Sequence, residues 1–243
     1  MNRILNIKIV LCSLLALFFS ITDVANAKYK FPKAGRGGTP QRSEGSAIRG
    51  CNQQEEAQLT PLAPQTHAGQ TISGRPIFAW YMLDSAAKQA EFLLYKHSEA
   101  GELEPKAILQ QQLDLSASSG MVTFFLPPEV PDLEVGLYTW KVVVFCRVNS
   151  PSTATLPYQA RLQVVEETPE LTAALTAVEG DAIARTEIWG EAGLWYNLLE
   201  EVLGLEDPAQ IMKILAELAE VEEGHSEVAQ KHGSQLRNIN LLP

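Results

Sequence analysis

The chain has 243 residues and a formal net charge of −10 at pH 7, with 29 acidic side chains against 19 lysines and arginines. This balance argues against nucleic-acid binding through broad phosphate contacts, because a surface of this sign repels a polyanion. The length suits one medium-sized domain or two small ones.

Residues 1–27 have the pattern of a secretory signal peptide. Basic residues precede an apolar run over residues 9–20, and Ala25 and Ala27 supply the small side chains that signal peptidases require. The run is short for a membrane span of about 20 residues. We therefore expect cleavage after Ala27, a periplasmic or secreted protein, and no stable membrane anchor.

Residues 28–50 form a basic, glycine-rich leader. Its glycines lack the spacing of a phosphate-binding loop, and the composition is typical of a flexible linker. The alternative is an arm that touches an anionic surface through its lysines and arginines.

The next part of the chain, residues 51–167, has the pattern of β-structure. Apolar and polar side chains alternate in short runs that are separated by turn residues. The expected strands cover residues 75–83, 88–96, 106–115, 120–128, 136–146 and 159–167. Such a series predicts an antiparallel, immunoglobulin-like β-sandwich.

Two cysteines, Cys51 and Cys146, remain after signal cleavage. An even pair in an oxidising compartment favours a disulfide, with two free buried thiols as the alternative. Cys146 ends an expected strand on the same face as Trp140, so the bond would tie the leader to the sandwich. The histidines do not have the spacing of metal ligands, and we expect no metal and no cofactor.

A helical pattern begins at Thr168, an N-cap residue that is followed by proline. Residues 168–222 contain three or four short amphipathic helices, with breaks at Gly180 and near Asp207. We expect them to form a cap on the sandwich. The tail, residues 223–243, is polar and is expected to be disordered.

Three aromatic residues of the helical region, Trp189, Trp195 and Tyr196, are candidates for a binding surface. They could line a pocket between the sandwich and the helices, or they could pack in the core. The glutamates of this region follow the polar faces of the helices, which is their ordinary place. No serine turn of a hydrolase, calcium loop, zinc helix or dinucleotide fingerprint occurs, so no catalytic residue is assigned and no enzymatic activity is expected.

Several segments together, in this order, resemble a known family. They are the leader that ends in Gly50 and Cys51, LTPLAP (59–64), RPIFAWYML (75–83), AEFLLY (90–95), LEVGLYTWKVVVFC (133–146) and GLWYNLL (193–199). The chain resembles the exported cyanobacterial proteins that are grouped as the domain of unknown function 928 family. The resemblance implies a periplasmic or secreted location and supplies neither an activity nor catalytic residues.

Three hypotheses for the function follow. The first is a non-catalytic binding or adaptor module that acts through protein–protein contacts with an unknown partner in the cell envelope. The second is a ligand- or glycan-binding protein with a pocket between sandwich and helices. The third is a hydrolase of envelope polymers, which would require buried carboxylates that converge in a cleft.

Overall fold

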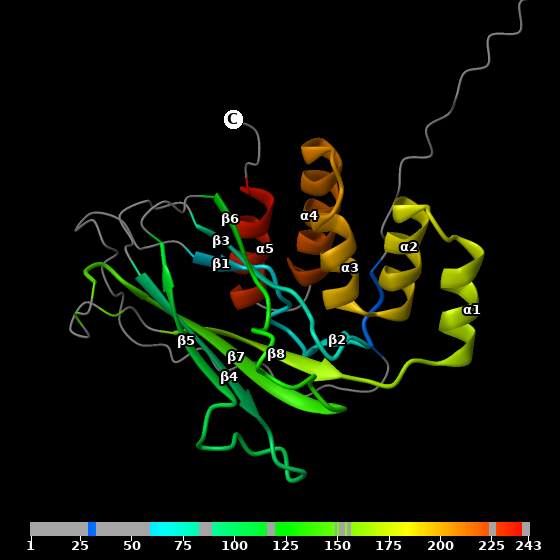
Figure 1. The fold of residues 1–243 in the computed structure, drawn as a ribbon. Helices are drawn as coiled ribbons and strands as arrows, with labels where there is room; N and C mark the ends of the chain where they lie inside the picture. The colour runs from blue at the N-terminus through cyan, green and yellow to red at the C-terminus, as the bar shows by residue number, and fades with distance from the viewer. Residues whose placement is uncertain are drawn as a thin grey trace, which may run out of the picture.

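A computed structural model describes residues 29–32, 59–82, 89–115, 120–148, 150, 154, 157–223 and 227–239. In these residues eight strands form two sheets, and five helices follow the last strand (Figure 1). The predicted signal peptide, most of the leader and Cys51 lie outside the described residues.

The smaller sheet has three antiparallel strands in the order β1 (Leu59–Pro61), β3 (Phe78–Met82) and β6 (Gly120–Phe124). The larger sheet has five strands, in the order β2 (Gly69–Thr71), β8 (Tyr158–Val164), β7 (Gly136–Phe145), β4 (Gln89–Lys96) and β5 (Leu109–Asp114). Strand β2 pairs with β8 in parallel, and the other neighbours in this sheet are antiparallel. Each sheet ends in two edge strands, so neither sheet is closed.

The antiparallel sheets and the C-terminal helices agree with the predicted fold class. The immunoglobulin-like arrangement is not confirmed, because the parallel β2–β8 pair departs from a purely antiparallel sandwich. Strands β1 and β2 were not expected from the sequence. Each has only three residues, which is too short for a recognisable alternation of apolar and polar side chains.

Aromatic side chains join the two sheets into one core. Phe78 of β3 lies 4.9 Å from Phe92 of β4 and 5.7 Å from Trp140 of β7, measured between ring centroids. Phe124 of β6 lies 4.3 Å from Phe92. These contacts place β3 and β6 over β7 and β4, and the tilted and edge-on ring pairs are favourable arrangements for aromatic groups.

Strand β7 confirms the predicted alternation. Tyr138, Trp140, Val142 and Val144 are buried on one face, while Lys141 on the other face is only partly buried. Cys146 follows the strand directly. Because Cys51 lies outside the described residues, the disulfide stays a prediction.

The helices are α1 (Pro169–Ala177), α2 (Ala182–Ala192), α3 (Trp195–Leu203), α4 (Pro208–Glu223) and α5 (Glu227–Arg237). The predicted N-cap is confirmed, since the Thr168 hydroxyl accepts from the Leu171 amide at 3.3 Å. Asp181 caps α2 in the same way after the break at Gly180. Such caps satisfy amides that the first helical turn leaves without an acceptor.

The five helices lie in a row from α5 to α1, each in contact with the next (Figure 1). Helix α3 contacts β2 and α5 contacts β1, so the helices cover the edge of each sheet that β1 and β2 form. Strands β5 and β6 form the opposite edges. No helix within the described residues is both long and apolar enough to cross a membrane.

Helix α5 lies in the tail that was expected to be disordered. Leu236 and Ile239 are buried, and Gly233 lies so close to α4 that a Cβ atom there would be 2.8 Å from the Ala219 carbonyl oxygen. A glycine at a close helix crossing allows a polar helix to bury a few side chains. Composition alone does not reveal this contact.

Candidate functional site

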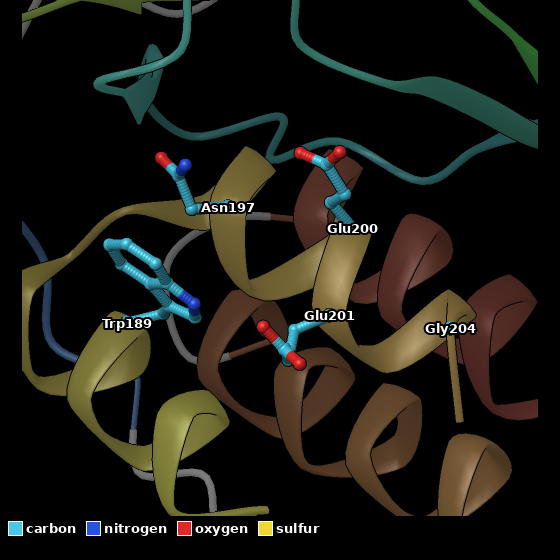
Figure 2. Close-up of a pocket in the computed structure, with 5 residues that line it drawn as sticks. All are labelled: Trp189, Asn197, Glu200, Glu201 and Gly204. Carbon is cyan, nitrogen blue, oxygen red and sulfur yellow. The ribbon is translucent and has the colours of Figure 1, made fainter. Parts of the chain in front are cut away.

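A pocket of about 260 Å³ opens beside helices α2 and α3 (Figure 2). Trp189 of α2 lines it together with Asn197, Glu200 and Glu201 of α3 and Gly204, the C-cap of α3. The last four positions have the spacing i, i+3, i+4 and i+7, so they share one face of the helix. The pocket is therefore a strip of α3 bounded by one aromatic side chain of the neighbouring helix.

Asn197 ties this strip to the end of β2. Its Oδ1 atom accepts from the Thr71 hydroxyl and from the Ile72 amide, both at 3.0 Å. The Ile72 N–H needs an acceptor, so the Asn197 side-chain atom next to it is the oxygen Oδ1 and not the nitrogen Nδ2. The Nδ2 group has no acceptor within the described residues.

The two glutamates of the pocket differ in their partners. The Glu201 carboxylate accepts from Nε and Nη2 of Arg185 at 3.0 and 2.6 Å, which joins α3 to α2 and raises the pKa of the guanidinium. Glu200 is exposed and has no hydrogen-bond or ion-pair partner among the described residues. Partial burial of its carboxyl group and the charge of Glu201 raise the pKa of Glu200.

Two of the three predicted surface aromatics are core residues. Trp195 and Tyr196 are each 1% exposed. The Trp195 indole donates to the Leu62 carbonyl at 3.0 Å, and the Tyr196 hydroxyl accepts from Trp140 at 2.7 Å. Their burial corrects the expected binding surface, because α3 turns both side chains toward the sheets.

Of those three residues, only Trp189 lines the pocket. The sequence pattern did not single out the other lining residues, although their helical spacing was visible; they are Asn197, Glu200, Glu201 and Gly204. The spacing shows that these residues share one face of the helix. It does not show whether neighbouring elements cover that face.

A second polar cluster is buried between the β1–β2 loop, residues 29–32 and helix α4. The Thr66 hydroxyl donates to Glu222 Oε1 at 2.8 Å, and the backbone N–H of Gln65 donates to Glu222 Oε2 at 2.8 Å. His67 lies 2.9 Å from the Thr66 oxygen through Nδ1 and 2.7 Å from the Tyr29 hydroxyl through Nε2. Since Thr66 gives its only proton to Glu222, it accepts from Nδ1–H of His67. The Tyr29 hydroxyl also lies 3.3 Å from the Gly193 carbonyl oxygen, and Nδ1 lies 3.7 Å from Glu222 Oε1.

This cluster connects three parts of the chain that are distant in sequence. Glu222 is 0% exposed, and Tyr29 and His67 are also buried. A buried carboxylate is costly unless its oxygens are hydrogen-bonded. The cluster meets that requirement and holds α4 against the β1–β2 loop. Glu222 lies in this cluster, whereas the acidic side chains that line the pocket are Glu200 and Glu201.

Buried phenols predict a loss of stability at alkaline pH. Burial raises the pKa of Tyr29, Tyr138 and Tyr196, and the charge of Glu222 raises that of Tyr29 further. The unfolded chain releases these protons near pH 10, while the folded state retains them. Their contribution to stability is therefore fully present below about pH 10 and is lost as the pH rises toward the folded pKa values.

The measurement is tyrosinate absorbance recorded together with circular dichroism. Part of the signal of the six tyrosines should appear only together with unfolding, above about pH 10. Reversible titration of all six near that pH, with the structure intact, would contradict the expectation.

Within the part of the chain that the structure describes, no three His, Cys, Asp or Glu side chains are grouped as metal ligands. No curated protein matches the chain. The family described as Domain of Unknown Function (DUF928) matches residues 44–232. This range includes both sheets, the pocket and Glu222. On the strength of that match the chain belongs to the DUF928 family.

Proposed function

We propose that the protein is a non-catalytic, extracytoplasmic binding or adaptor module that holds a protein partner at the edge strand β5. The observation that carries the proposal is the difference between the two sides of the sheets. Helices cover the side of β1 and β2, and no described element covers β5. The signal-peptide pattern at the N-terminus supports the location.

Strand β5 has few of the features that prevent edge strands from pairing. Natural edges are usually blocked by proline, lysine, a bulge or very short length. The sequence LQQQLD contains neither proline nor lysine, and six residues pair regularly with β4. The outward side chains of Gln110 and Gln112 bond to Glu91 and Gln89 of β4. The backbone groups on the other side of β5 have no strand partner in the described residues.

Exposed apolar side chains lie where β5 begins. Leu103 and Ile108 are each 40% exposed. Leu103 forms a bridge with His97, and the Ile108 amide donates to the Leu94 carbonyl at 2.7 Å, so both are held close to β4. An open backbone edge beside apolar side chains is what a partner strand needs, because main-chain bonds give affinity and side-chain contacts give specificity.

The test compares capture of partners by wild type and by Ile108→Lys. The new lysine places a charge beside the edge and removes an apolar contact. Because Ile108 is exposed, the fold should tolerate the substitution. We expect retention of the specific partner from an envelope extract to fall at least about fivefold, since an interface anchor is typically worth more than 1 kcal/mol. The control is Val148→Lys, because Val148 is also exposed but lies beyond the opposite end of the sheet.

Hydrogen exchange on the purified complex locates the interface. The partner should slow exchange of the β5 amides. Equal capture by wild type and Ile108→Lys, or a bound partner that leaves these amides unprotected, would contradict the proposal.

A further inference from the structure

The pocket beside α2 and α3 contains an indole N–H donor that makes no hydrogen bond within the described part of the chain. Trp189 is 9% exposed, and its indole N–H makes no hydrogen bond with any described residue. The indole nitrogen is not itself fully buried, so a molecule that enters the pocket can reach it. In Figure 2 the indole nitrogen lies on the side of the ring that faces Glu201 across the pocket. Trp189 therefore directs an unused donor into the pocket.

Asn197 supplies a second donor. It is also 9% exposed, and its oxygen is occupied by Thr71 and Ile72. The amide nitrogen cannot exchange places with that oxygen, because the Ile72 N–H requires an acceptor. Its two N–H groups have no acceptor in the described part of the chain and are left for a molecule in the pocket.

Glu200 supplies an acceptor at the rim. Its carboxylate has no described partner, whereas Glu201 is neutralised by the two bonds from Arg185. The pocket thus carries the charge of one carboxylate beside two neutral donors. The site differs from the exposed glutamates elsewhere on the helices because one pocket is lined by both the donors and the acceptor.

These groups select a chemical class of ligand. An anion would be repelled by Glu200, and a cation offers no acceptor for the N–H groups of Trp189 and Asn197. A hydroxyl group accepts and donates at once, so a neutral molecule with several hydroxyls satisfies all three side chains. A volume of about 260 Å³ is slightly below the usual range of drug-sized pockets, about 300–1,000 Å³, and suits one small ring.

We propose that this pocket binds one pyranose sugar residue, either free or at the end of a glycan. Ring hydroxyls would accept from Trp189 and Asn197 and donate to Glu200. The site lies on α2 and α3, whereas the partner edge proposed above is strand β5, so the two sites extend the function independently.

The experiment is an NMR titration of the ¹⁵N-labelled protein without its signal peptide. Glucose, galactose and N-acetylglucosamine are added separately, up to about 100 mM, and a chitin or cellulose oligosaccharide then tests the end of a glycan. The readout is the indole N–H resonance of Trp189, which Trp189→Phe identifies by its loss. We expect at least one of these sugars to shift this resonance in a saturable way, with a Kd in the millimolar range, about −4 kcal/mol.

Two variants test the contacts. Glu200→Gln should weaken binding about tenfold, because a hydrogen bond to a charged group is worth about 1.5–3 kcal/mol. The control Glu187→Gln, an exposed α2 residue outside the pocket, should bind as wild type. Both positions are exposed, so folding should be unaffected.

Three results would overturn the proposal. One is the absence of a saturable shift with all of the sugars. Another is unchanged binding in Glu200→Gln. The last is an equal or larger saturable shift of the same resonance with tetramethylammonium chloride, which would assign the pocket to cations. Binding of oligosaccharides alone would support the proposal and identify the glycan end as the ligand.

Discussion

Replacing Trp140 by alanine should lower the free energy of unfolding by about 3–5 kcal/mol, the usual cost of removing a buried tryptophan or phenylalanine. The side chain is fully buried on β7. Its ring centroid lies 5.7 Å from Phe78, 6.5 Å from Trp80 and 6.1 Å from Phe92, and its indole donates to the Tyr196 hydroxyl at 2.7 Å. One substitution therefore loosens the contact between the two sheets and the contact with α3. Because domains are typically stable by only about 5–15 kcal/mol, this loss is a large fraction of the total.

Urea unfolding, followed by circular dichroism, measures the change in free energy. Tyr196→Phe removes the hydroxyl alone and should cost about 1–3 kcal/mol, because it leaves the Trp140 N–H without its acceptor. Lys141→Ala, on the opposite face of the same strand, is the control and should cost less than about 1 kcal/mol. If Trp140→Ala cost no more than this control, the sheets would not share the core described here.

Replacing Glu222 by alanine should lower the free energy of unfolding by about 2–6 kcal/mol. The backbone N–H of Gln65 and the Thr66 hydroxyl are buried donors, and each would lose its acceptor. Each loss costs about 1–3 kcal/mol. The effect should extend beyond α4, because Thr66 positions His67 and His67 bonds to Tyr29. Hydrogen exchange should therefore become faster in the β1–β2 loop as well as in the helix.

Two further variants distinguish the loss of these hydrogen bonds from a change in the helix propensity of α4. Glu222→Gln keeps one oxygen acceptor and should lie between wild type and Glu222→Ala. Glu220→Ala lies on the exposed side of the same helix and should change the free energy of unfolding by less than about 0.5 kcal/mol. An equal, small effect of Glu222→Ala and Glu220→Ala would show that the buried cluster does not hold α4 in place.

Local signals predicted much of the secondary structure. The alternation around Trp140 identified a strand with one fully buried face, since period two reports which side of a strand meets a core. Thr168 and the break at Gly180 located the start of the helical region, because capping depends on a few neighbouring residues. These features could be predicted from the sequence since each is decided within a short segment.

The site was less predictable for a physical reason. Trp189, Trp195 and Tyr196 are neighbours in sequence with similar chemistry, but only Trp189 lines the pocket. The difference depends on which face of each helix meets β2 and the core, and that is decided by contacts with distant segments. Contacts with distant segments also decide the parallel pairing of β2 with β8 and the burial of helix α5.

The sequence by itself determined the acidic net charge, the positions of the longer strands, the helix caps and the buried face of β7, because composition, periodicity and capping can be read without the fold. Only the tertiary structure decided which edges the helices cover, that Glu222 meets the β1–β2 loop, and that Asn197 and Glu200 border a pocket. These features arise when segments far apart in the chain pack together, and a periodic pattern does not specify its distant partner.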